Sequence, residues 1–168
     1  DITFFTNEKF DTTNMVSTLF NAKDFMNDDI IISYADIIYK KEILEKLITS
    51  NEDFNVVIDK DWRTLWSLRM ENPLEDAETL RVVDGNIVEL GKKTNNYDDI
   101  EGQYIGLIKI SKSTMARVTA FYESLDKDKL YDGQAYDNMY MTSLIQMIID
   151  NLVDVKPVFI NGGWIEID

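Results

Sequence analysis

The feature that most constrains the fold is the apolar run from Ile30 to Tyr39, which one carboxylate, Asp36, interrupts. A run this rich in isoleucine and tyrosine predicts a strand buried on both faces, as inside a parallel sheet. A charge at the far end of such a strand is costly unless a partner or a metal ion compensates it. Ligands of open α/β sheets gather at the C-terminal ends of strands. Asp36 is therefore either a ligand-binding residue or a cap of the turn after the strand.

Strand-like and helix-like patterns alternate along the chain, with no repeat and no flexible linker between them. The patterns predict strands at 2–6, 30–34, 54–58, 103–110 and 155–160, and helices at about 14–25, 41–49, 113–122 and 137–152. Asp84 and Gly85 predict a hairpin turn, whereas 62–78 has no clean period. We expect one domain over 1–168 of the α/β class: a mostly parallel, Rossmann-like mixed sheet with flanking helices and a small antiparallel hairpin.

The sequence contains no histidine and no cysteine. Catalytic Ser-His-Asp triads, cysteine nucleophiles and histidine-ligated zinc are therefore excluded within it. A metal site would need oxygen ligands, which suit Mg²⁺, Mn²⁺ or Ca²⁺. The seven glycines form neither common phosphate-binding loop. The net charge of -14 argues against a nucleic-acid partner. No apolar stretch reaches the roughly 18 residues that cross a membrane, so we expect a cytoplasmic protein with no membrane partner.

Carboxylates alternate with isoleucines near residue 168. The alternation places Glu166 and Asp168 on one face of an extended segment, after Trp164. Two carboxylates on one face can hold a hard divalent cation, especially when a third carboxylate joins them. A solvated edge strand with its polar side outward explains the same pattern.

Aromatic and charged residues are mixed between 62 and 69. Trp62 and Trp66, together with Tyr104, are able to enclose a cationic head group through cation–π contacts. Arg69 is suited to binding a phosphate. Tryptophans are also common in protein cores, so core packing is the alternative explanation for this segment.

Several short segments, in this order along the chain, carry a family resemblance: Asn7–Phe10, Thr13–Asn14, Ser33–Tyr39, Val57–Trp62, Arg69–Glu78, Gln103–Leu107, Tyr140–Gln146 and Gly162–Asp168. They resemble nucleotidyltransferases with the nucleotide-diphospho-sugar (GT-A-like) fold, in the branch of phosphocholine and related cytidylyltransferases. The resemblance implies transfer of a nucleotide from a nucleoside triphosphate, with CTP favoured, to a phosphorylated or phosphonylated small molecule, with release of pyrophosphate. Phosphocholine, 2-aminoethylphosphonate and a sugar 1-phosphate remain open as acceptors.

The resemblance also implies the site residues. Asp36 would be the catalytic residue, and Asp36, Glu166 and Asp168 would bind Mg²⁺. The candidate substrate-binding residues are Asn14, Trp62, Trp66, Arg69, Tyr104 and Trp164.

The chain departs from the family pattern in one respect. Family members begin with a strand and a Gly-rich loop carrying an Arg and a Lys, and no such loop occurs between Asp1 and Asp168. We therefore expect 1–168 to be the later two-thirds of a nucleotidyltransferase domain, with weak or absent catalysis alone. Association with a missing N-terminal segment, or formation of a homo-oligomer, would follow. The alternative is a non-catalytic binding or assembly module that retains the fold without the nucleotide cradle, because an open sheet edge invites a partner strand.

Overall fold

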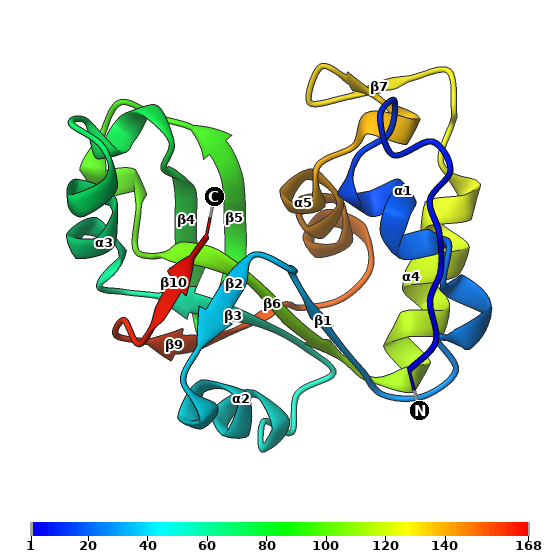
Figure 1. Cartoon of the computed structure of the whole chain (residues 1–168), viewed down its shortest axis with the longest axis horizontal. Helices are drawn as coiled ribbons and strands as arrows, with labels where there is room; N and C mark the ends of the chain where they lie inside the picture. The colour runs from blue at the N-terminus through cyan, green and yellow to red at the C-terminus, as the bar shows by residue number, and fades with distance from the viewer. Residues whose placement is uncertain (1, 168) are drawn as a thin grey trace.

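Two central strands, β3 (Phe54–Asp59) and β6 (Gln103–Ile110), organise the fold in the computed structural model, which describes residues 2–167 (Figure 1). The sheet has the order β1-β6-β3-β9, with β1 (Ile30–Ser33) and β9 (Lys156–Ile160) at its edges. β6 runs antiparallel to β1 and to β3, whereas β9 is parallel to β3. β1, β3 and β9 therefore share one direction, which confirms the prediction of a mixed, mostly parallel α/β sheet.

The remaining elements surround this sheet or form small sheets of their own. The α-helices are α1 (Met15–Phe20), α2 (Lys41–Ile48), α3 (Trp62–Arg69), α4 (Lys112–Ser124) and α5 (Met141–Asn151). Short 3₁₀ turns occur at Lys23–Phe25, Pro73–Glu75, Tyr97–Asp99 and Tyr136–Asn138. The antiparallel strand pairs are β2 (Ile37–Tyr39) with β10 (Trp164–Glu166), β4 (Glu78–Val83) with β5 (Asn86–Lys93), and β7 (Leu130–Tyr131) with β8 (Gln134–Ala135). No helix within residues 2–167 is long and apolar enough to cross a membrane.

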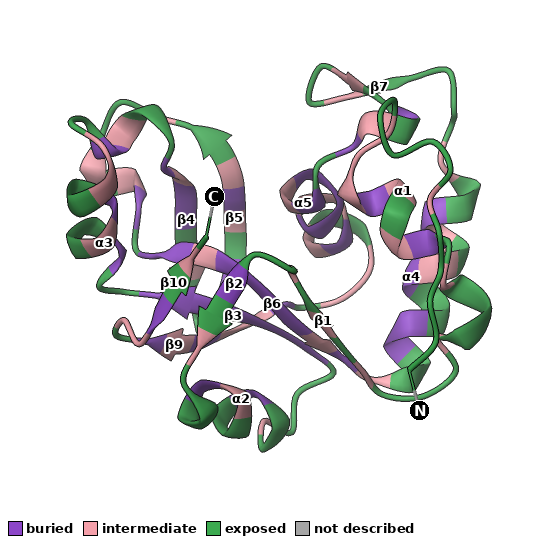
Figure 2. Ribbon diagram, viewed as in Figure 1, coloured by how far each residue is buried: buried purple, intermediate pink, exposed green. Residues whose placement is uncertain are grey.

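The two faces of the central sheet bury two separate cores. Val56 and Ile58 of β3 pack into a core with α1, α4, α5 and the β4–β5 hairpin. Val57, between them, packs into the other core with α2, α3 and the β2–β10 pair. This division follows from the period of two in a strand, which sends successive side chains to opposite faces. Every residue of β3 is consequently buried, as the purple ribbon at the centre of Figure 2 shows.

The expectation of one strand buried on both faces from Ile30 to Tyr39 is wrong. The run breaks into β1, an edge strand that is half-buried at best, and β2, which belongs to another sheet. Asp36 lies in the turn between them and is exposed. Its charge therefore costs little free energy, and the burial argument for a ligand at Asp36 does not hold. The buried two-faced strand is β3 instead.

Two other expectations need correction. Residues 2–6 form no strand, and Ile2 and Phe4 are exposed. Residues 62–69 form helix α3 although their sequence shows no clean period. The period is unclear because only two side chains of the helix, Trp62 and Trp66, are buried. A helix held to the core by two large residues four positions apart leaves a weak periodic signal.

Gly106 leaves room for the Tyr34 ring to pack against β6. It has a φ of +84° inside β6, and a Cβ there would lie 2.6 Å from Cγ and Cδ2 of Tyr34. The register of β3 against β6 shifts at the same place, between Val56 and Ile58. Tyr34 N donates a hydrogen bond to Gly106 O at 2.9 Å. Glycine is needed here because the Tyr34 ring occupies the space of a side chain.

Substitution of Gly106 by alanine should therefore destabilise the protein more than a positive φ alone explains. Gly85, in the hairpin turn, has a φ of +76°, and a Cβ there would meet no atom within 4 Å, so Gly85→Ala measures the backbone strain alone. We expect Gly106→Ala to lower the free energy of unfolding by about 1–3 kcal/mol more than Gly85→Ala does. Urea denaturation of both variants checks this, and equal losses would contradict the close packing of Tyr34.

Candidate functional site

Asp59, at the end of β3, fixes the segment that leads into β10. It is fully buried, and its carboxylate accepts three hydrogen bonds: from Asp61 N at 2.9 Å, Gly162 N at 2.7 Å and Trp164 Nε1 at 2.8 Å. A buried carboxylate with this many donors is well compensated. Asp59 therefore joins the end of a central strand to a turn more than 100 positions later.

β10 then brings the backbones of Asp36 and Glu166 to adjacent positions of two paired strands. Glu166 lies opposite Ile37 in the antiparallel β10–β2 register, and Ile167 N donates to Asp36 O at 2.7 Å. Asp36 is thus next to the partner of Glu166 on the neighbouring strand. Asp168, the third predicted metal ligand, lies outside the described residues. Within residues 2–167, no group of three or more acidic side chains is placed to hold a metal ion, so the three-carboxylate site stays a prediction.

Arg69, at the end of α3, contacts the same strand. Its Nη1 lies 2.6 Å from Oε2 of Glu166, and both side chains are half-buried. Charge-assisted hydrogen bonds of this length fix both partners. Arg69 therefore holds the Glu166 carboxylate in position, and its predicted contact with a phosphate is not tested.

A cavity of about 440 Å³, which we call the central cavity, opens beside Glu166. Its lining residues are Met15, Tyr34, Trp66, Asp76, Glu78, Lys93, Gln103, Tyr104, Ile105, Gly106, Tyr140, Met141, Thr142, Trp164 and Glu166. They come from α1, the β1–β2 turn, α3, the β4–β5 hairpin and the residue Asp76 before it, β6, the start of α5, and β10. Four of the residues predicted from the sequence, Trp66, Tyr104, Trp164 and Glu166, thus share one cavity.

The other predicted substrate-binding residues lie beside this cavity or in the core. Asn14 caps α1, where its Oδ1 accepts from Met15 N at 2.7 Å, and Met15 itself lines the cavity. Trp62 is buried, stacks on Tyr97 and is not among the lining residues. Core packing, the alternative explanation, therefore describes Trp62, whereas Trp66 is buried with part of its surface at the cavity.

Sequence reasoning missed the most polar part of the cavity. Burial raises the pKa of Glu78 to about 7, although the nearby Lys93 ammonium acts in the opposite direction. Burial also raises the pKa of Tyr34, and the carboxylates of Glu78, Asp36 and Glu166 add to this increase. The Tyr34 hydroxyl donates to Met15 Sδ at 2.8 Å, and burial raises the pKa of Tyr104, to which the neighbouring Tyr34 hydroxyl adds.

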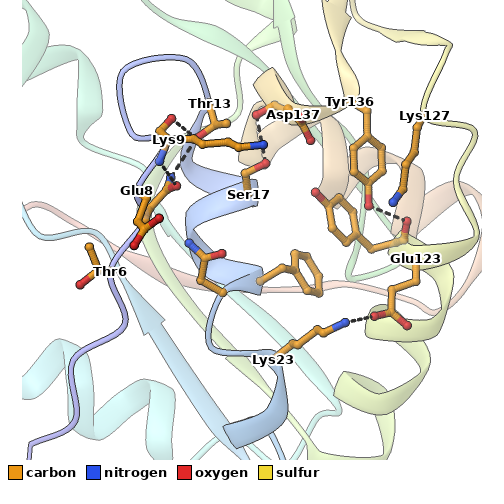
Figure 3. Close-up of a pocket in the computed structure, with 14 residues that line it drawn as sticks. Thr6, Glu8, Lys9, Thr13, Ser17, Lys23, Glu123, Lys127, Tyr136 and Asp137 are labelled. Atoms are coloured by element: carbon orange, nitrogen blue, oxygen red, sulfur yellow. Dashed lines mark hydrogen bonds and ion pairs between the residues drawn. The ribbon is translucent and has the colours of Figure 1, made fainter.

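A second cavity, of about 630 Å³, lies between α1 and α4 (Figure 3). None of the residues predicted for the site lines it. Lys23 forms an ion pair with Glu123, and Lys127 lies over the Tyr136 ring at 5.6 Å. Because four of the predicted site residues line the smaller central cavity and none lines this one, we assign the functional site to the central cavity.

Solved structures share this fold at low sequence identity. The inositol-1-phosphate CTP transferase from T. maritima aligns with a TM-score of 0.71 and 18% identity over 96% of this chain and 58% of that one. A glucose-1-phosphate thymidylyltransferase from Bacillus anthracis, solved with sucrose, aligns with a TM-score of 0.59 and 14% identity over 92% of this chain and 55% of that one. This chain therefore spans less than two-thirds of either structure. The fold is that of the nucleotide-diphospho-sugar nucleotidyltransferases.

Sequence comparison identifies the family more narrowly. No family model matches the chain. A CTP:phosphoglutamine cytidylyltransferase from Campylobacter jejuni subsp. jejuni serotype O:2 is 54% identical over 171 residues, which cover 98% of this chain and 68% of that protein. The chain belongs to the cytidylyltransferase family of nucleotidyltransferases, as its sequence resemblance indicated.

The hydrogen bonds of Asp59 should make it important for stability. Asp59→Ala leaves the N–H groups of Asp61, Gly162 and Trp164 without their acceptor. We expect the free energy of unfolding to fall by about 3–5 kcal/mol, since buried donors lose their partner together. Asp53→Ala, at an exposed carboxylate before the same strand, should change it by less than about 0.5 kcal/mol. Similar results for the two variants in urea denaturation would contradict this role.

The raised pKa of Glu78 predicts a dependence of stability on pH. The pKa of Glu78 is about 7 in the folded protein, against an ordinary value of 4.5. Ionisation therefore favours the unfolded chain, and its cost develops between these two pH values. Relative to Glu78→Gln, the wild type should lose on the order of 2 kcal/mol of stability between pH 4.5 and pH 8. Urea denaturation of both proteins at pH 4.5 and 8 measures it, and a constant difference would disprove the shift.

Proposed function

We propose that the protein is a Mg²⁺-dependent cytidylyltransferase that transfers the cytidylyl group of CTP to a phosphorylated small molecule and releases pyrophosphate. The placement of Glu166 carries this proposal: Glu166 lines the central cavity, contacts Arg69 and lies on the strand bonded beside Asp36. The name of the Campylobacter relative favours phosphoglutamine as the acceptor over phosphocholine, 2-aminoethylphosphonate and a sugar 1-phosphate.

Mg²⁺ suits the residues beside the cavity. Magnesium in phosphate-transfer sites is held by one or two carboxylates, and substrate phosphates and water complete its shell. Glu166, which lines the cavity, would supply one such carboxylate, and we propose Asp36 and Asp168, at neighbouring backbone positions, as the others. The ion would neutralise charge on the phosphates during transfer.

The reaction requires no covalent intermediate on the protein. An oxygen of the acceptor phosphate forms a bond to the α-phosphorus of CTP, and the bond between that phosphorus and the bridging oxygen of pyrophosphate breaks. Positioning and charge stabilisation supply most of the rate acceleration in such reactions. A sequence without histidine or cysteine is compatible with this chemistry.

The chain's own residues would then act by positioning. Arg69 would keep the Glu166 carboxylate oriented, and Asp59 would keep β10 in place through Trp164. Trp66 and Trp164, whose rings lie 6.0 Å apart, would form an apolar wall that excludes water from the acceptor.

The test is pyrophosphate release from CTP and phosphoglutamine, with and without Mg²⁺, by a protein in which residues 1–168 are joined to the N-terminal segment that the family resemblance implies. We expect release that EDTA abolishes and excess Mg²⁺ restores. Glu166→Gln should reduce kcat by about two orders of magnitude and raise the Mg²⁺ concentration needed for half-maximal activity. Glu42→Gln, at an exposed carboxylate of α2, is the matched control and should be unaffected.

Two results would contradict the proposal. Pyrophosphate release that does not depend on a divalent cation would contradict the role of Mg²⁺. Unchanged activity of the Glu166→Gln variant would contradict the assignment of the site to the central cavity. A protein that binds the acceptor without releasing pyrophosphate would instead support the non-catalytic binding module.

A further inference from the structure

Glu78 is held rigidly at the edge of the central cavity. It is the first residue of β4 and lies opposite Lys93 of β5 in the hairpin register. Its backbone is bonded on both sides by the Gln103 amide: Glu78 N donates to Oε1 at 3.0 Å, and Glu78 O accepts from Nε2 at 2.5 Å. The side chain therefore leaves a fixed backbone, and it lines the cavity.

The Glu78 carboxylate differs from the other acids of the cavity in having no hydrogen-bond donor within residues 2–167. Asp76 accepts from Trp66 Nε1 at 2.9 Å, and Glu166 contacts Arg69. Lys93 Nζ donates to the carbonyl oxygens of Asp76 at 2.8 Å and Glu75 at 3.3 Å. The Glu78 carboxylate is open to the central cavity, so a ligand bound there can supply the donors that the described residues do not.

Two further features lie at the same place. The Tyr104 hydroxyl, on β6, is buried beside the Tyr34 hydroxyl and has no other polar partner among the described residues. A side cavity of about 20 Å³ borders both Glu78 and Tyr104. This space is enough for one water molecule but not for a counterion with its own shell. Glu78 and Tyr104 also both line the central cavity, so a ligand bound there can reach them.

The ligand group that satisfies Glu78 must carry positive charge and N–H donors. A primary ammonium provides both, and charge-assisted hydrogen bonds to a carboxylate are among the strongest in proteins. A quaternary ammonium provides charge but no donor, and a sugar hydroxyl provides a donor but no charge. Lys93 places an ammonium beside Glu78, so the pair presents opposite charges to the two ends of an amino-acid group.

We infer that Glu78 is the residue that selects the acceptor, by binding its primary ammonium group, with Lys93 beside it for the carboxylate of an amino acid. This assignment rests on the proposed transfer to a phosphorylated small molecule. It makes the acceptor class phosphorylated amino acids or other primary amines, and it disfavours phosphocholine and sugar 1-phosphates.

The test compares two acceptors at equilibrium, phosphoglutamine and its counterpart lacking the α-amino group, by calorimetry at pH 8. Wild type should bind phosphoglutamine at least about tenfold more tightly than the counterpart. Glu78→Gln should weaken phosphoglutamine binding by about 10–100-fold and change binding of the counterpart by less than about twofold. Glu75→Gln removes a nearby exposed carboxylate that does not line the cavity, and should change neither.

Each other result overturns the assignment. If Glu78→Gln weakens the binding of both acceptors equally, Glu78 has a structural role. If it weakens the binding of neither, the ammonium group of the acceptor binds to another residue. Glu78→Gln removes a buried charge without changing the side-chain volume, so it should fold, and its melting temperature checks this. Pyrophosphate release by wild type, measured in parallel, separates the two proposals: its absence counts against the transferase, whereas release without discrimination between acceptors counts against Glu78 alone.

Discussion

The buried Asp59 carboxylate is the interaction on which the site depends. Taking a carboxylate out of water is costly, and here three N–H donors compensate the cost only if the turn at Gly162 and the Trp164 ring stay in place. The folded state thus selects one position for that turn. β10 follows directly, and with it the pairing to β2 that places Glu166 beside Asp36. The buried charge of Asp59 therefore positions residues that would contact a substrate, although Asp59 itself does not line the cavity.

A second constraint comes from the direction of β6. Because β6 runs against β1 and β3, it returns its first residues, Gln103 and Tyr104, to the edge where β3 ends. Gly106 then allows Tyr34 to lie against β6, and Gln103 holds the hairpin through Glu78. The cavity is therefore built by one antiparallel strand among parallel ones. A wholly parallel sheet would carry these residues to its opposite edge.

The sequence predicted the parts whose signal is local. Strand 103–110, helix 41–49 and the Asp84-Gly85 hairpin agree with the structure, because period and turn chemistry suffice for each. Burial of the run from Ile30 to Tyr39 was predicted wrongly, since a strand at a sheet edge has the same composition as a central one. Which strand lies at the edge depends on long-range pairing, which composition does not encode.

Long-range pairing also explains why part of the candidate site was missed in the sequence. The structure places the backbones of Asp36 and Glu166 on adjacent strands, which neither spacing nor alternation implied, and their shared metal ion stays a prediction. Glu78 and Tyr34 were missed because each acquires its role from a partner far along the chain, Gln103 for one and Gly106 for the other. Gly106 did carry a signal: an isolated glycine inside a strand pattern marks a close approach of another segment. It predicts that something packs there without saying what.

The acidic side chains of the cavity differ in how their negative charges are compensated. The cavity that we propose for phosphorylated substrates is lined by Asp76, Glu78 and Glu166, whose negative charge has the same sign as a phosphate. Asp76 is satisfied by an indole N–H and Glu166 by Arg69, so neither leaves an uncompensated charge. Glu78 is the exception among the described lining residues, and a carboxylate left without a donor repels phosphate unless the ligand brings a cation to it. In our proposal, an acceptor that carries its own ammonium turns this repulsion into attraction, whereas a sugar phosphate brings no cation to Glu78. In this proposal, Glu78 would both weaken the binding of sugar phosphates and strengthen the binding of acceptors that carry an ammonium group.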